Sequence, residues 1–211
     1  MRFVTYLHDS DIKLGAQLND WILDLRQAQD YLSESKYVAN GKAPTNAFTP
    51  ELITELMSNS QFIKEVQKNI LFIQESLPNS VEPLKSKAIL LQSDQVSLIP
   101  PIINPGKLIC VGMNYPAPGS AEDQRAAYPV LFLKPNSTLT GHQHPILLPR
   151  ISDEVFCEGE LAIVIGKTGK HISIENALSH VAGYTIANDI GARDLEQRTS
   201  QWATGKLPDT F

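Results

Sequence analysis

A proline-dense segment near the middle of the chain limits the possible folds more than any other feature. The segment Ile99-Pro100-Pro101-Ile102-Ile103-Asn104-Pro105-Gly106 contains three prolines within eight residues. Proline fixes φ and lacks the amide hydrogen that a central strand donates, so this segment does not belong in a sheet interior. We therefore expect an extended connector that divides the chain into two domains, residues 1–104 and residues 105–211.

Before the connector, the sequence shows short strands followed by helices. Polar and apolar residues alternate, as in a small antiparallel sheet, over residues 3–7, 13–18 and 21–25. One helix is predicted from about Leu25 to Ser35. A second is predicted to begin at Thr49-Pro50-Glu51, where a threonine cap and a proline at the first helical position coincide. It should break near Ser58-Asn59-Ser60 and end at Pro78.

After the connector, strands dominate the prediction. Apolar runs of strand length occupy residues 107–111, 130–133, 160–165 and 181–186, and a helix is expected over residues 173–180. The fold class predicted from these patterns is α+β, with a small N-terminal α+β domain preceding a strand-rich second domain.

Charge and hydropathy restrict the partners of the chain. Its 211 residues have a formal net charge of −5 and contain no cluster of basic residues, which argues against a nucleic-acid partner. The apolar start is too short for a signal peptide, and no apolar run reaches the roughly 18 residues of a membrane helix. We expect a cytoplasmic protein with no membrane partner. Cys110 and Cys157 cannot build a disulfide framework and are expected to be buried structural thiols.

Two glutamates, Glu158 and Glu160, are two residues apart in a predicted strand, so their side chains leave the same face. Neighbouring carboxylates repel each other unless a positive charge lies between them, and a hard cation such as Mg²⁺, Mn²⁺ or Ca²⁺ would suit. The alternative is that both glutamates lie on the solvent-exposed face of an edge strand. The apolar run 161–165 favours the metal, because it indicates a strand covered on both faces.

A third carboxylate, Asp189, follows the predicted strand 181–186. Strand ends often present ligands, because the scaffold there is rigid and the following loop can shape a pocket. Asp189 would therefore supply a further oxygen ligand. The alternative is an aspartate that caps the following turn.

Taken in order, several motifs resemble the fumarylacetoacetate hydrolase superfamily. They are Lys107-Leu108-Ile109-Cys110-Val111-Gly112-Met113-Asn114-Tyr115, Phe132-Leu133-Lys134-Pro135, Glu158-Gly159-Glu160-Leu161, Gly183-Tyr184-Thr185-Ile186-Ala187-Asn188-Asp189, Ala192-Arg193-Asp194 and Gly205-Lys206-Leu207-Pro208-Asp209-Thr210-Phe211. The resemblance covers residues 107–211. It implies a mixed β-sheet roll, a homodimer, a divalent metal and a small-molecule 2-keto or β-diketo acid substrate.

The resemblance also implies roles for individual residues. Lys206 matches the lysine of the site, where its charge would stabilise a developing enolate. The substrate-binding residues would be Arg193, Asn114 and Tyr115. The metal ligands, for Mg²⁺ or alternatively Mn²⁺ or Ca²⁺, would be Glu158, Glu160 and Asp189.

The sequence departs from the family pattern in three places. Hydrolytic members carry a histidine and a glutamate that activate water, and Pro118 and Ala121 stand at those positions. Glu122, next to them, is the remaining candidate for a catalytic base. The family's glutamine three residues after the arginine is replaced by Glu196, which adds negative charge close to the site.

The third departure is at the end of the sequence, because the family core continues beyond the block that ends at Phe211. Two functions therefore remain open. The chain is either a metal-dependent hydrolase or lyase that cleaves, decarboxylates or isomerises a 2-keto acid, or a catalytically impaired or truncated member that acts as a binding or oligomeric partner.

Overall fold

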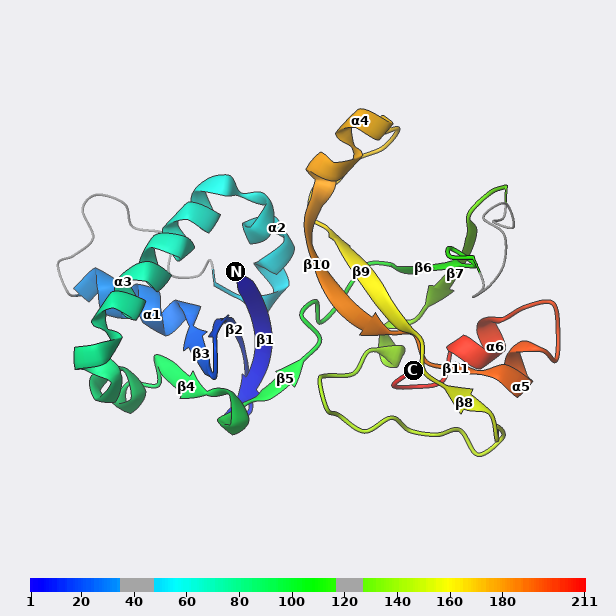
Figure 1. Ribbon diagram of the computed structural model, residues 1–211, viewed down its shortest axis with the longest axis horizontal. Coiled ribbons are helices and arrows are strands. Elements are labelled where there is room, and N and C mark those ends of the chain that lie inside the picture. Colours follow the sequence, from blue (N-terminus) through cyan, green and yellow to red (C-terminus); the bar gives the residue numbers. More distant parts are fainter. Residues whose placement is uncertain (35–47, 117–126) are drawn as a thin grey trace. The chain divides into compact units, whose positions relative to one another are not determined.

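The computed structural model describes residues 1–34, 48–116 and 127–211 (Figure 1). The chain forms two compact units: the first holds residues 1–103 and 161–185, and the second holds residues 104–160 and 186–211. The division at the proline-dense connector into residues 1–104 and 105–211 remains a prediction. Within the described residues, no helix combines the length and apolarity that a membrane span needs.

The first unit contains a five-stranded antiparallel sheet in the order β4-β3-β2-β1-β5. Its strands are β1 (Arg2–His8), β2 (Asp11–Leu18), β3 (Trp21–Asp24), β4 (Leu90–Gln92) and β5 (Ser97–Ile99). Asp9 and Ser10, with φ of 51° and 67°, form the two-residue turn between β1 and β2. Tight hairpins need positive φ at these positions, which aspartate tolerates better than most residues. The first three strands confirm the sequence-based prediction.

The helices of this part are α1 (Leu25–Glu34), α2 (Ile53–Ser58) and α3 (Ser60–Ser86). Asn59 caps α3, since its side-chain oxygen accepts hydrogen bonds from the amides of Gln61 and Phe62 at 3.0 and 3.2 Å. The predicted break between α2 and α3 is thereby confirmed. Thr49 is the N-cap residue and Pro50 begins the helical segment, as predicted, but this segment is a short 3₁₀ helix, Pro50–Leu52, and the Thr49 side chain makes no capping hydrogen bond.

The prediction that Pro78 ends the helix is wrong, because α3 continues to Ser86. A proline inside a helix costs about 3 kcal/mol. Ile73 before it and Leu84 after it are each only 1% exposed, so apolar burial holds the helix on both sides of the proline.

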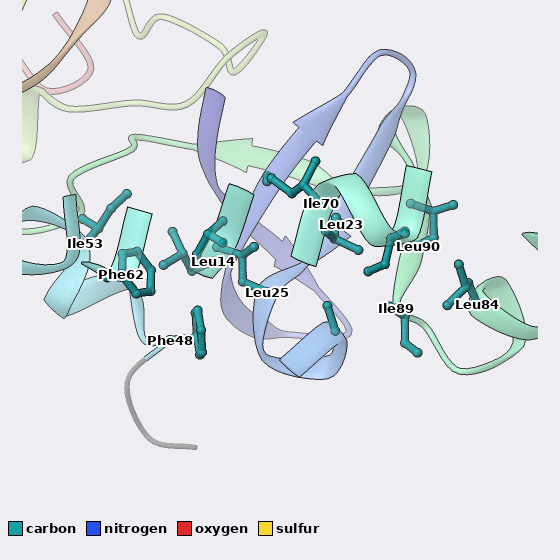
Figure 2. Close-up of a cluster of buried hydrophobic side chains, with 14 residues drawn as sticks. Leu14, Leu23, Leu25, Phe48, Ile53, Phe62, Ile70, Leu84, Ile89 and Leu90 are labelled. Carbon is teal, nitrogen blue, oxygen red and sulfur yellow. The ribbon is translucent and has the colours of Figure 1, made fainter. Parts of the chain in front are cut away.

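The core of the first unit lies between the sheet and helices α1 and α3 (Figure 2). Strand residues such as Leu14 and Leu23 meet helical residues such as Ile70 there. Ile22 points the other way, as alternation along a strand requires, into a smaller cluster with Tyr6 and Leu91. This unit therefore has the usual architecture of a sheet with apolar side chains on both faces.

The residues after the connector form short strand pairs. β6 (Leu108–Gly112) pairs antiparallel with β7 (Val130–Lys134), and β8 (Val155–Phe156) pairs antiparallel with β11 (Gly191–Ala192). β9 (Gly159–Ile165) pairs with β10 (Val181–Asn188), and both strands run from one unit into the other. The remaining helices are short: α4 (Ile174–Ala177), the 3₁₀ helix Leu178–His180, α5 (Arg193–Glu196) and α6 (Ala203–Lys206).

The α+β class is confirmed, and in the described residues the sheets of the second unit stay open. The expectation that residues 161–165 form a strand covered on both faces is wrong. Leu161, Ile163 and Ile165 are 56–60% exposed, whereas the residues between them are half-buried. An apolar run in the sequence shows which residues form the strand. Whether these residues are buried depends on which other parts of the protein pack against the strand.

Candidate active site

The candidate site lies in the second unit, where the segment before β9 meets the end of β10. Asp189 directly follows β10, at the strand end predicted from the sequence. Its amide donates a hydrogen bond to the carbonyl of Glu158 at 2.8 Å. The amide of Glu158 in turn donates to the side-chain oxygen of Asn188 at 3.0 Å. These two bonds hold the carboxylate-bearing segments next to each other.

Lys206, at the end of α6, reaches both of these carboxylates. Its ammonium nitrogen lies 2.5 Å from Oε2 of Glu158 and 3.4 Å from Oδ2 of Asp189. It also donates a hydrogen bond to the Asp189 carbonyl at 3.0 Å. The lysine side chain is only 6% exposed, so its charge depends on these oxygens instead of water. The structure therefore brings together three of the residues singled out from the sequence.

Lys134 is a site residue to which the sequence assigned no role. Its side chain is 3% exposed, and its ammonium lies 2.5 Å from Oδ1 of Asp189 and 3.2 Å from the carbonyl of Ile190. A signal was present in the sequence. Lys134 ends an apolar strand in phase with Phe132, so it leaves the same face of β7.

The thiol of Cys110 is affected by the charged groups of the site. The pKa of the Cys110 thiol is raised to about 11, first by burial and then by the negative charge of Asp189, with a further contribution from Glu160. Lys134 and Lys206 act in the opposite direction. Glu160 itself is half-buried. Cys157, by contrast, is exposed, so the expectation of two buried thiols is wrong for it.

Aromatic rings form one wall of the site. The guanidinium carbon of Arg193 lies 4.1 Å from the centre of the Phe156 ring, and the Lys206 ammonium lies 5.2 Å from the same ring. Phe132 contacts Trp202 edge-on, with their ring centres 6.3 Å apart. Cations over aromatic faces gain about 0.5–2 kcal/mol, and an apolar wall also strengthens electrostatic interactions beside it.

The other site residues predicted from the sequence are exposed or lie outside the described residues. Asn114 and Tyr115 follow β6 and are exposed, with 65% of Tyr115 accessible to solvent. Arg193 is exposed too, apart from its contact with Phe156. Glu122, together with Pro118 and Ala121, lies outside the described residues.

Across residues 1–34, 48–116 and 127–211, no three Asp, Glu, His or Cys side chains are grouped so that they could hold a metal ion. Lysine ammonium groups lie against the carboxylates instead. The donor chemistry nevertheless fits a hard divalent cation, because Lys206 shows that Glu158 and Asp189 already share one positive charge.

Comparison with known proteins relates the second half of the chain to a family of enzymes. Residues 107–211 match the family described as "Fumarylacetoacetate (FAA) hydrolase C-terminal". The chain is 36% identical over 171 residues to human "Oxaloacetate tautomerase FAHD2A, mitochondrial", covering 79% of this chain and 51% of that protein. It is 40% identical over 149 residues to "Oxaloacetate tautomerase fahd2, mitochondrial" of Xenopus laevis, covering 65% of this chain and 44% of that protein. The chain thus spans about half the length of these curated relatives.

Solved structures agree with this relationship. The 5-carboxymethyl-2-hydroxymuconate delta-isomerase from Mycobacterium smegmatis has a TM-score of 0.60 at 27% identity, covering 100% of this chain and 63% of that one. Maleylpyruvate hydrolase from Sphingobium sp. SYK-6, in complex with manganese(II) and pyruvate, has a TM-score of 0.59 at 26% identity, covering 100% of this chain and 64% of that one.

Proposed function

Because residues 107–211 belong to the fumarylacetoacetate hydrolase superfamily, we propose that this chain carries a divalent-metal-dependent site for a 2-keto or β-diketo acid. Keto–enol tautomerisation of oxaloacetate is the first candidate reaction. One structural observation carries the proposal: the ammonium of Lys206 is buried among the carboxylates of Glu158 and Asp189. A concentration of opposite charges in a half-buried place suits the binding of an anionic substrate together with a cation.

The metal would be held by Glu158, Glu160 and Asp189, with Mg²⁺, Mn²⁺ or Ca²⁺ as candidates. When bound, a divalent cation polarises the keto oxygen of such a substrate. Lys206 would have to give up its position between Glu158 and Asp189, and its charge would then be free to face the substrate. The solved maleylpyruvate hydrolase in complex with manganese(II) and pyruvate supports the pairing of a divalent cation with a 2-keto acid.

The chain's own residues suit proton transfer better than hydrolysis. Hydrolysis needs an activated water, and the positions at which the family's hydrolytic dyad would stand are Pro118 and Ala121. Tautomerisation moves one proton between carbon and oxygen and consumes no water. Glu122 remains the proposed base should water activation occur. The names of the curated relatives, oxaloacetate tautomerases, support the same choice.

Four side chains would bind and orient the substrate. Lys206 would place its positive charge near the enolate oxygen, where negative charge develops. Arg193, stacked on Phe156, would bind a substrate carboxylate. Asn114 and Tyr115 would contribute from the exposed end of β6.

The test is oxaloacetate tautomerisation by the purified chain with Mg²⁺ or Mn²⁺, measured against metal alone. We expect activity that EDTA removes, and a loss of about 100-fold or more in kcat/KM for Lys206→Met. Lys170→Met, at an exposed lysine of the first unit, is the matched control and should behave as the wild type. Added metal should also raise the Tm, and Glu158→Ala should abolish that increase. Absence of any metal effect on both activity and Tm would overturn the proposal.

A second candidate is a catalytically impaired member of the family that acts as a binding or oligomeric partner, for instance as a homodimer. The observation in its favour is the exposed apolar face of the β6–β7 pair, where Ile109, Val111, Leu131 and Leu133 are 45–60% exposed. Light scattering would give the oligomeric state. A stable dimer without tautomerase activity would favour this second function over the first.

A further inference from the structure

Phe156, in β8, contacts two cations of the proposed site. The guanidinium carbon of Arg193 lies 4.1 Å from the centre of its ring, and the ammonium of Lys206 lies 5.2 Å from the same point. The surroundings of these cations differ. The Lys206 side chain is only 6% exposed and is bound to Glu158, whereas Arg193 is exposed. One aromatic ring therefore contacts a cation inside the site and a cation that faces solvent.

The strand opposite Phe156 makes room for its ring. β8 pairs with β11 so that Phe156 stands directly across from Gly191. A Cβ at Gly191 would lie 2.7 Å from Cζ and 2.9 Å from Cε1 of the ring, so the ring occupies the space that a side chain there would need. Glycine in a strand often marks such a close approach. Because the half-buried ring is held in this space, it offers Arg193 a fixed surface.

Arg193 depends on this ring for its orientation. Its backbone amide donates a hydrogen bond to the carbonyl of Glu154 at 2.9 Å, which fixes the start of α5. Its guanidinium forms no hydrogen bond or ion pair with any other described side chain. A guanidinium stacked on a ring keeps its N–H groups at its edge, where they can bind both oxygens of a carboxylate.

We propose that Phe156 is a positioning residue that directs the guanidinium of Arg193 at the second carboxylate of a 2-keto dicarboxylic acid. The inference rests on the proposed function, in which Arg193 binds a substrate carboxylate, and deepens it by naming acids with two carboxylates as the preferred substrates. Phe156 acts through Arg193 and touches no reacting atom. A 2-keto monocarboxylic acid leaves Arg193 without a partner and should therefore bind more weakly.

The first test compares two stable hydroxy acids, L-malate and L-lactate, of which only malate has a second carboxylate. Titration calorimetry of the purified chain at one Mg²⁺ concentration would give both Kd values. We expect the wild type to bind malate about tenfold more tightly than lactate. Phe156→Leu should weaken malate binding by about threefold to tenfold and leave the Kd of lactate within about twofold.

The matched control removes a ring from a cation in the first unit. The Lys87 ammonium lies 5.1 Å from the centre of the Tyr31 ring, so Tyr31→Leu takes away the same kind of contact outside the site. It should leave both Kd values unchanged. Equal affinities of the wild type for malate and lactate would overturn the inference.

A double-variant cycle tests whether Phe156 acts through Arg193. Arg193→Met should remove the preference for malate, and adding Phe156→Leu should cause no further loss. Independent, additive losses would overturn the positioning role. Should Phe156→Leu fail to fold, 3,4,5-trifluorophenylalanine at position 156 keeps the shape of the ring and weakens the negative potential of its face. Malate affinity should again decrease, and an unchanged value would overturn the inference.

These binding measurements separate the inference from the proposed function. A chain that tautomerises oxaloacetate with Mg²⁺, yet keeps its preference for malate in Phe156→Leu, would overturn the inference and leave the proposed function standing. A preference for malate that Phe156→Leu reduces, in a chain without tautomerase activity, would support the inference and count against the proposed reaction alone.

Discussion

In the first unit the fully buried side chains are mostly apolar, whereas the second unit buries the ammonium groups of Lys134 and Lys206. The same second unit leaves apolar strand residues such as Leu131 and Leu133 about 60% exposed. The first unit is therefore stabilised by the hydrophobic effect in the ordinary way. The second has a small apolar cluster of Ile190, Ala192, Leu195 and Phe211, but it also buries two ammonium groups and exposes apolar strand residues, which is typical of a functional site.

The buried carboxylates of Asp24 and Glu196, one in each unit, differ as well. In the first unit, the Tyr6 hydroxyl donates to Oδ2 of Asp24 at 2.8 Å, and the amide of Gln27 donates to Oδ1 at 2.9 Å. That carboxylate ties the start of α1 to the sheet and has its hydrogen bonds satisfied. In the second unit, Glu196 has a buried oxygen without a partner. Groups left unsatisfied in a folded protein often take part in its function.

Removing a buried charge from the second unit should have the largest effect. Lys134→Met leaves Asp189 with one counter-ion fewer, and we expect a loss of about 3–5 kcal/mol in the free energy of unfolding. The measurement is denaturant unfolding followed by Trp202 fluorescence in a Trp21→Phe background, because each unit contains one of the two tryptophans.

The control for this prediction is Lys107→Met, at an exposed lysine beside β6. Should Lys134→Met prevent folding, the double variant with Asp189→Asn should recover stability, because both members of the ion pair are then removed. A Lys134→Met variant as stable as the control would show that the ion pair is dispensable.

A core truncation in the first unit should have the next largest effect. Leu23 is fully buried between the sheet and the helices (Figure 2), and Leu23→Ala should cost about 3 kcal/mol through lost apolar contacts and a cavity. Unfolding would be followed by Trp21 fluorescence in a Trp202→Phe background. Leu71→Ala on α3, where the leucine is 58% exposed, should stay within about 0.5 kcal/mol of the parent. Equal losses for the two variants would contradict the assignment of the core.

The same substitution in the second unit should have the smallest effect. Leu131 is 60% exposed, so Leu131→Ala should change the free energy of unfolding by less than about 0.5 kcal/mol. The comparison with Leu23→Ala is direct, since the atoms removed are identical. A loss near that of Leu23→Ala in dilute solution would mean that this apolar face is covered.

Much of the local structure could be predicted from the sequence. Alternation located β1, β2 and β3, apolar runs located the longer strands after the connector, and Asn59 was recognised at the break between α2 and α3. These features depend on residues close in the chain. The continuation of α3 past Pro78 could not be predicted, because it depends on how Leu84 packs against distant residues.

Some residues of the candidate site could likewise be predicted from the sequence, and others could not. Glu158, Asp189 and Lys206 were recognised from their motifs, and the structure places them in contact. Lys134 was missed, because its importance comes from Asp189, 55 residues further along the chain. The exposure of Leu161 and Ile163 was also missed, since an apolar strand pattern does not say whether another layer covers it.

The sequence by itself determined where the strands and most helices lie, and it predicted which carboxylates and which lysine to expect at the site. Its resemblance to the family also implied that Pro118 and Ala121 stand in place of the hydrolytic dyad. Only the tertiary structure decided how the charges are paired. It placed two ammonium groups against Asp189 and left an oxygen of Glu196 without a partner. The physical reason is that periodicity and motifs act along the chain, whereas electrostatic pairing and burial depend on distances through space.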